Sequence, residues 1–371
     1  MEGTKPRTAS SIGMFDMLKG AGMLTIVFAH TAELYPMQSV SGLSLTAFFP
    51  FIYREALMAA FFIASGYGFR KRSIGKCIHQ QLKSLLKPYL YTMLFTCVLH
   101  FIIHYKTFRY LPGTIGESIK VTGGFLLGLP HTAEYFGQEF FSCGPMWYLL
   151  ALLVGWILLD VILNIFPERY IPWAVAGCAV LGWGASLAWA LPFCLIQGAV
   201  VVPYLYLGFI AKKHHLLDAK LPPKVFVGLL AATAFIAVGA LATRTTDCIS
   251  LAEWSLGPLS IFLDGAAGLL FIRLFLRLSR AHGPIVRFLE AVGRRSLHIF
   301  CIHTVELIAI PWYLMVAKFS AQPVLGMWLQ YAIAIGSIWL VCELLRARRA
   351  LIIRFFPARR RTPAVHYTAR H

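Results

Sequence analysis

The chain has 371 residues, of which 58% are hydrophobic and only 13% are charged, and its mean hydropathy is +0.69. A soluble chain of this length carries far more charge and arranges its apolar residues in amphipathic stripes, so this composition excludes a soluble protein. The formal net charge is +18, but the basic residues lie in short segments between apolar runs, as membrane-topology signals do. This distribution argues against nucleic-acid binding.

Ten apolar runs can each supply the ~20 helical residues that cross about 30 Å of hydrocarbon. In chain order they are 15–35, 47–69, 88–105, 144–165, 171–190, 194–211, 224–243, 255–278, 294–316 and 323–345. Lys and Arg are concentrated at the two ends and in every second gap, and they are sparse in the other gaps. By the positive-inside rule this alternation predicts an all-α, multi-pass bundle of about ten spans in the plasma membrane, with both termini in the cytoplasm.

The same pattern divides the chain into three parts. Residues 1–14 form a cytoplasmic N-terminal tail, 15–345 form the transmembrane domain, and 346–371 form a basic cytoplasmic tail that anionic lipid attracts. No soluble secreted domain follows the first apolar run, so we interpret it as an uncleaved span rather than a signal peptide. The longest outer connection is 106–143, and its apolar stretch 119–130 contains a Gly pair that predicts a re-entrant or interfacial element.

The eight cysteines are scattered, and no Cys-x-x-Cys pair occurs. The sequence therefore predicts neither a zinc site nor a redox pair of that type. Cys143 and Cys248 both fall in predicted outer loops, and they can pair only if those loops meet.

Two stretches, "FAHTAEL" and "CIHTVEL", place His-Thr-x-Glu inside apolar runs. A charge at mid-bilayer costs roughly 2.5–3.5 kcal/mol on insertion scales, so such groups face the bundle interior, pair, or line a cavity. His30 and Glu33 share a helical face, where a carboxylate orients an imidazole and raises its basicity, as a general base requires. The alternative is a histidine that only bonds a neighbouring helix. His303 and Glu306 repeat the spacing, and a metal site of two His and two carboxylates is a third possibility.

The second span ends in Ser65 and Gly66, and Arg70, Lys71 and Arg72 follow. These cations are either a positive-inside anchor or a clamp for phosphate oxygens, which Arg forks match. At the outer start of the fourth span, Trp147 is either an aromatic-belt residue or part of a binding site.

Five stretches together resemble the acyltransferase 3 family of integral membrane acyltransferases. They are "FDMLKGAGMLTIVFAH", with Lys19 eleven residues before His30, "FFIASGYGFRKR", "KSLLKPYL", "GPMWYLLALL" and "RRSLHIFCIH". The order and spacing hold over about 300 residues. This chain has Lys19 where many members have Arg, which keeps the charge but loses the bidentate fork.

The resemblance implies transfer of an acyl group, commonly acetyl, from cytoplasmic acyl-coenzyme A to a hydroxyl of an extracytoplasmic or membrane-associated glycan or similar acceptor. Our mechanistic hypothesis gives His30 the role of general base toward the acceptor hydroxyl, with Glu33 orienting it, and the alternative is a transient acyl-histidine. The donor-binding residues that the resemblance implies are Lys19, Ser65, Gly66, Arg70, Lys71 and Arg72. The acceptor side would include Trp147, His303 and Glu306, and no metal is implied.

Spacing is consistent with these roles, because eleven residues at 1.5 Å rise separate Lys19 from His30 by about 16 Å, the approximate reach of a pantetheine arm. The rival function is a transporter or flippase, in which the buried His, Glu and Asp264 form a proton path. Transporters built on inverted repeats show internal symmetry, and this sequence shows none. The acceptor, the acyl chain length and the oligomeric state are not encoded in any recognisable motif.

Overall fold

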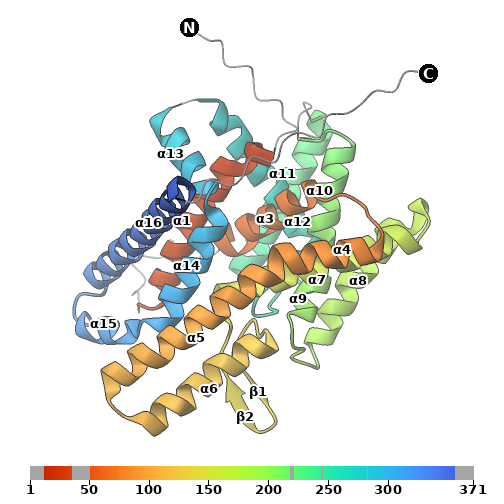
Figure 1. Cartoon of the computed structure of the whole chain (residues 1–371). Coiled ribbons are helices and arrows are strands. Elements are labelled where there is room, and N and C mark those ends of the chain that lie inside the picture. Colours follow the sequence, from red (N-terminus) through yellow and green to blue (C-terminus); the bar gives the residue numbers. More distant parts are fainter. Residues whose placement is uncertain (1–11, 36–50, 218–220, 244, 282, 356–371) are drawn as a thin grey trace, which may run out of the picture.

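The computed structural model describes residues 12–35, 51–217, 221–243, 245–281 and 283–355 (Figure 1). Most of the predicted N-terminal tail and residues 356–371 of the predicted C-terminal tail lie outside this range.

In the first half the helices are η1 (Ile12–Phe15), α1 (Asp16–Glu33), η2 (Phe51–Leu57), α3 (Met58–Tyr67), α4 (Ile74–Gln81), η3 (Leu82–Leu86), α5 (Lys87–Phe108), α6 (Leu111–Leu127), η4 (Gly144–Met146), α7 (Trp147–Ile165), η5 (Glu168–Tyr170) and α8 (Ile171–Ser186).

In the second half they are α9 (Leu195–Val200), α10 (Val202–Lys213), α11 (Pro223–Thr243), α12 (Pro258–Leu278), η6 (Ser279–Ala281), α13 (Pro284–Gly293), α14 (Ser296–Ala309), α15 (Trp312–Lys318) and α16 (Pro323–Phe355). Two short antiparallel strands, β1 (Ala133–Tyr135) and β2 (Gln138–Phe140), form a hairpin beside α6 (Figure 1). The all-α architecture that the composition predicts is therefore confirmed.

Six helical segments of the described chain are long and apolar enough to cross a membrane. They are Ile74–Phe108, Gly144–Ile165, Leu195–Lys213, Pro223–Thr243, Pro258–Ala281 and Pro323–Arg348. Helices α14 and α15 meet at a 64° bend and together make a seventh candidate. The other predicted spans coincide with α1, with η2 plus α3, and with α8, which are shorter or less apolar. The protein is thus a multi-helix membrane protein, and the count of ten spans stays a prediction.

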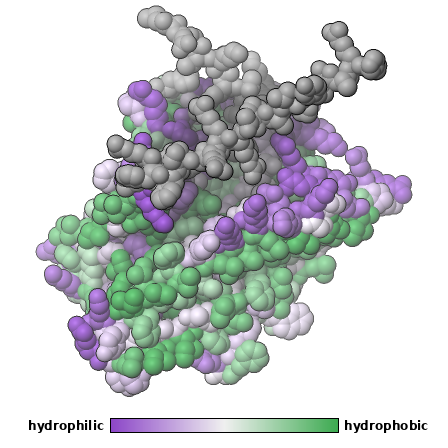
Figure 2. All heavy atoms as spheres, in the orientation of Figure 1, coloured by the Kyte–Doolittle hydropathy of each residue, from purple (hydrophilic) through white to green (hydrophobic). Residues whose placement is uncertain are grey.

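Helix α5 presents one of the apolar surfaces of the bundle. Its side chains are largely uncovered by protein, with Leu94 and Phe95 56% and 61% exposed. Figure 2 shows a hydrophobic band over α5, bordered by hydrophilic side chains over α4. The helix continues upstream without interruption to Ile74, and η3 is a π-helical segment that ends two residues before Pro88. Such a segment accommodates a proline, which lacks an amide hydrogen and crowds the preceding turn.

The Gly pair in 119–130 lies inside a continuous helix, and the re-entrant or interfacial placement of this stretch stays a prediction. Helix α6 runs through Gly123 and Gly124. A Cβ on Gly124 would lie 1.7 Å from the carbonyl oxygen of Phe141, so this position accepts only glycine at the present helix-to-loop separation. The glycines therefore let the segment after β2 pack closely on α6.

Close helix contacts also fix α3, which carries Ser65 and Gly66. A Cβ on Gly66 would lie 2.1 Å from the carbonyl oxygen of Leu205 in α10, and one on Gly208 would lie 2.0 Å from that of Ile63. Small residues at facing positions allow helix backbones to approach in this way in membrane bundles. Helix α3 is therefore held rigidly against α10, with Ser65 on a neighbouring face.

Candidate active site

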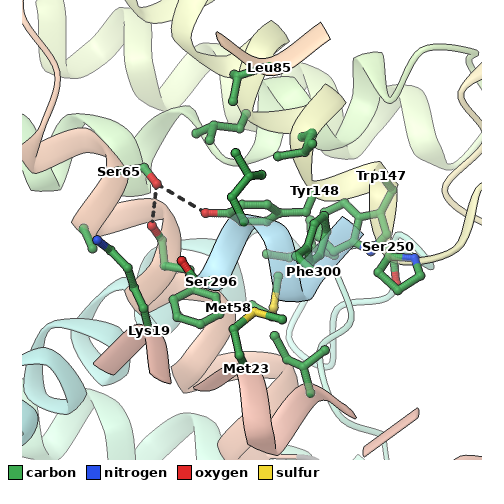
Figure 3. A pocket seen from close by; sticks show the side chains of 18 of the residues that line it. Lys19, Met23, Met58, Ser65, Leu85, Trp147, Tyr148, Ser250, Ser296 and Phe300 are labelled. Carbon is green, nitrogen blue, oxygen red and sulfur yellow. Dashed lines mark hydrogen bonds between the residues drawn. The ribbon is translucent and has the colours of Figure 1, made fainter. Parts of the chain in front are cut away.

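A cavity of about 730 Å³ lies between α1, η2, α3, α7 and α14. Most of its wall is apolar, and the middle is lined by Met23, Met58, Phe61, Leu149, Leu152 and Phe300. Ser65 and Tyr148 also line it, and their hydroxyl groups are hydrogen-bonded to each other at 3.2 Å. In Figure 3, Lys19 and Ser65 lie on one side of the cavity and Trp147 and Ser250 on the other. The cavity thus has two ends with different chemistry.

One end of the cavity is cationic. Four basic side chains line it, namely Lys19, Arg70, Arg72 and Lys212. Lys19 is 3.3 Å from Asp16 on the same helix, and the Lys212 ammonium lies over the Tyr67 ring at 5.8 Å from its centroid. The Arg70 and Arg72 side chains belong to an exposed loop between α3 and α4. An anion of several charges can therefore be held at this mouth.

Helix α7 fixes the loop that carries these arginines. The backbone amide of Arg72 donates to Asp160 Oδ1 at 3.0 Å, and Asn164 Nδ2 donates to the Arg72 carbonyl at 2.9 Å. Asp160 is completely buried, so a charge-assisted hydrogen bond accounts for its presence in an apolar helix. The arginine backbone is therefore positioned before any ligand arrives.

The other end of the cavity contains His30 and the groups that hold Glu33. His30 Nδ1 lies 3.5 Å from Glu33 Oε2. The second carboxylate oxygen, Oε1, accepts hydrogen bonds from Arg54 Nη2 at 2.6 Å and from the Tyr53 hydroxyl. Arg54 Nε also donates to the Tyr53 oxygen at 2.8 Å. Two donors from η2 thus fix one oxygen of Glu33 and leave the other directed at the imidazole.

The second His-Thr-x-Glu stretch lies directly behind the first. The rings of His30 and His303 are stacked with centroids 5.7 Å apart. His303 Nδ1 is 3.0 Å from Glu306 Oε2, and its Nε2 is buried without a hydrogen-bond partner among the described residues. Helices α1 and α14, far apart in sequence, therefore bring the two stretches into contact. Within the described residues, no group of three or more His, Cys, Asp or Glu side chains has a geometry that could hold a metal ion.

Most of the predicted site residues line this one cavity. The predicted residues that line the cavity are Lys19, His30, Glu33, Ser65, Arg70, Arg72 and Trp147. Of the other four, Lys71 is exposed outside the described cavity wall, and Gly66 is buried against Leu205. His303 and Glu306 stand one layer behind His30, so their contact with the cavity runs through that ring.

Sequence reasoning did not assign several residues of the wall. These are Tyr53, Arg54, Tyr148, Lys212, Ser296 and the segment from Cys248 to Leu251. The adjacent Arg54 and Glu55 inside an apolar run were a usable signal, because paired ionisable groups in a span mark functional or structural polar contacts. The segment 248–251 carried no such signal, since it reaches the cavity only through tertiary folding.

The remaining intramembrane acids form a cluster on the other side of η2. Glu55, Asp247 and Asp264 are each 1% exposed. The amide of Asp247 donates to Glu55 Oε1 at 2.9 Å, and the Tyr204 hydroxyl is 3.5 Å from Asp264 Oδ2. Asp264 does not belong to the described lining of the cavity. These acids connect η2, α12 and the segment before α12. A transporter's proton path that used Asp264 would therefore not run through the described cavity.

The model of a protein family described as an acyltransferase domain, Acyl_transf_3, matches residues 12–346, which is nearly the whole described chain. No curated protein and no solved structure matches the chain significantly.

Proposed function

The chain belongs to the acyltransferase 3 family and is a membrane acyltransferase, and we propose that it transfers an acyl group, in particular acetyl, from cytoplasmic acyl-coenzyme A to a hydroxyl of an extracytoplasmic or membrane-associated glycan or similar acceptor. One observation carries the proposal: a single cavity has cations at one end and the imidazole of His30 at the other. The proposal includes ten spans in the plasma membrane with both termini in the cytoplasm, which puts Arg70 and Arg72 at the cytoplasmic face.

The cationic end suits the donor. Coenzyme A carries several phosphate charges, and guanidinium groups bind phosphate oxygens in pairs of hydrogen bonds. Lys19 and His30 lie on the same helix, eleven residues or about 16 Å apart. A pantetheine arm that enters between Lys19 and Arg70 therefore reaches His30 through the apolar middle of the cavity, with its thioester away from bulk water.

The imidazole end suits the transfer step. With its Nδ1 proton directed at Glu33, His30 would accept the proton of the acceptor hydroxyl at Nε2. The hydroxyl oxygen attacks the thioester carbonyl, the carbon–sulfur bond breaks, and the imidazolium returns the proton to the departing thiolate. Glu33 stabilises the transient imidazolium, and Tyr53 and Arg54 hold Glu33 in place.

The acceptor would approach from the end that contains Trp147, Ser250 and Arg54. An indole face packs well against the apolar face of a sugar ring, and the polar groups beside it can bond hydroxyls. His303 and Glu306 would act on the acceptor side through their contact with His30. Mass spectrometry of surface glycans from cells with and without this protein identifies the acceptor. The acceptor glycan from cells that lack the protein should be lighter by the mass of one acyl group.

The donor assignment is tested by charge reversal at three neighbouring positions. Arg70→Glu and Arg72→Glu should each weaken binding of acetyl-coenzyme A to the purified full-length protein by about tenfold or more, since a charge-assisted hydrogen bond contributes ~1.5–3 kcal/mol. Lys71→Glu is the matched control, because Lys71 has the same location and charge but does not line the described cavity. Equal losses in all three variants would indicate only a general surface potential, and absence of binding to the unaltered protein would contradict the proposal.

A further inference from the structure

Two buried cysteines from distant segments meet at the end of α6. Cys143 directly precedes η4, Cys194 directly precedes α9, and neither is exposed. Cys143 donates its backbone amide to the Leu129 carbonyl at 2.9 Å, and the Cys194 thiol donates to the Gly128 carbonyl at 3.2 Å. The side chains of Cys143 and Cys194 are neighbours, and both thiols are free in the structure. Adjacent carbonyls of one turn therefore hold both cysteines in place beside each other.

The backbone around Cys194 is held in an unusual conformation. Phe193 and Cys194 have φ angles of 58° and 51°, in the left-handed region that residues other than glycine rarely occupy. The amide of Phe193 donates to the Leu127 carbonyl at 2.7 Å, which fixes the segment on the end of α6. Strained conformations of this kind persist where the surrounding structure determines them fully. Here the result is that the Cys194 thiol is directed at the Gly128 carbonyl, beside the turn that also holds Cys143.

We propose that Cys143 and Cys194 form a disulfide bond in the mature protein. The inference rests on the orientation in the proposed function, which puts both residues at the extracytoplasmic face, where disulfides form and persist. The pairing of Cys143 with Cys248, which the sequence left open, is not the one the structure favours. Cys248 instead lines the cavity, with its sulfur 3.3 Å from the Ser250 hydroxyl.

The oxidation takes place by thiol–disulfide exchange during folding, before both sulfurs are buried. A bond forms between the two Sγ atoms, and the two thiols lose two electrons and two protons in total. The disulfide of an extracytoplasmic thiol–disulfide oxidoreductase accepts them and becomes a dithiol.

This bond joins two segments of the cavity wall. Pro145 and Trp147, just after Cys143, line the cavity at its acceptor end. Gln197, just after Cys194, is buried and donates from Nε2 to the Ser250 carbonyl at 3.4 Å, and Ser250 also lines the cavity. A covalent link between the two cysteines therefore fixes the position of Trp147 relative to Ser250.

Counting thiols in the full-length protein tests the proposal. The protein is extracted from its own membranes, denatured in the presence of an alkylating maleimide, and weighed by mass spectrometry with and without prior reduction. We expect all but two of the eight cysteines to react without reduction and all eight to react after it. Peptide mapping should recover Cys143 linked to Cys194. Reaction of all eight without reduction, or a link from either residue to Cys248, would overturn the proposal.

Two variants make the result specific. Cys143→Ser should release Cys194, so every remaining cysteine reacts without reduction. Cys178→Ser is the matched control, because Cys178 is a half-buried cysteine within α8, and its loss should leave the two protected thiols unchanged. Neither measurement uses acyl transfer. If the protein transfers acyl groups and all eight thiols are free, the disulfide proposal is wrong and the proposed function stands. If the protein is inactive and the disulfide is present, the proposed function is wrong and the disulfide proposal stands.

Discussion

The two His-Thr-x-Glu stretches have the same residue types at the same spacing, and yet their surroundings differ. The side chain of His30 is 29% exposed and lines the cavity, whereas that of His303 is 1% exposed and stands behind it. Glu33 is bonded by Tyr53 and Arg54, while Glu306 has His303 as its recorded partner. The comparison shows that the role of an imidazole–carboxylate pair depends on whether its side chains are accessible from the cavity. The accessible pair can act on substrate, and the buried pair can only support it.

The largest expected effect is at His30. Replacement by Gln keeps the size of the side chain but removes the base, and positioned proton transfer contributes about a hundredfold to ten-thousandfold to rate. His30→Gln should therefore lower acyl transfer by about a hundredfold or more, with the affinity for acetyl-coenzyme A unchanged. Initial rates with labelled donor and a binding isotherm measure the two quantities. Near-normal transfer in this variant would exclude His30 as the base.

A smaller loss is expected at Glu33. In Glu33→Gln the amide oxygen still accepts hydrogen bonds from Tyr53 and Arg54, but the side chain no longer balances the imidazolium that forms during transfer. The rate should fall by about tenfold, because the pair contributes of order 1–2 kcal/mol through one charge-assisted hydrogen bond. Comparing its kcat with its KM separates this loss from weaker binding. An unchanged kcat would show that Glu33 has no part in orienting the base.

Substitution of His303 should lower stability more than activity, whereas substitution of His30 should lower activity more than stability. His303→Gln leaves the buried Glu306 without its imidazole partner, and an unsatisfied buried group costs about 1–3 kcal/mol. We expect a lowered thermal unfolding temperature in detergent and a loss of transfer of less than about tenfold. His30→Gln should show the reverse, with a near-normal unfolding temperature. A loss of transfer at His303 equal to that at His30 would break the distinction between the two stretches.

The smallest effect is expected at Arg54. Arg54→Lys keeps the charge near Glu33 but cannot contact both Glu33 and the Tyr53 oxygen, as the guanidinium does. The transfer rate should fall by only about two- to fivefold, in proportion to a lost hydrogen bond of ~0.5–1 kcal/mol. Arg54→Met, which removes the charge as well, should cause a larger loss. Equal rates in the two variants would show that the charge at this position is unimportant.

Much of the site could be predicted from local sequence because it depends on one helix. Lys19 and His30 lie on α1 at a fixed rise per residue, and the basic residues after Ser65 follow the end of α3 directly. The all-α membrane architecture likewise follows from apolar runs.

What could not be predicted depends on tertiary contacts. The stacking of His30 on His303 requires α1 and α14 to pack together, and no local pattern encodes that contact. Arg70 and Lys71 are indistinguishable by charge, but only the first lines the described cavity. Donor binding by Gly66 stays a prediction, and the structure adds a steric reason for glycine there, its close contact with Leu205.

In the proposed mechanism, one cavity joins a donor on the cytoplasmic side to a base near the opposite side. The most direct measurement is acyl transfer in sealed membrane vesicles of known orientation, with labelled acetyl-coenzyme A supplied on one side only. We predict that labelled glycan or other acceptor accumulates only when the donor is on the side that exposes Arg70 and Arg72. Transfer from donor supplied on the opposite side would contradict the account.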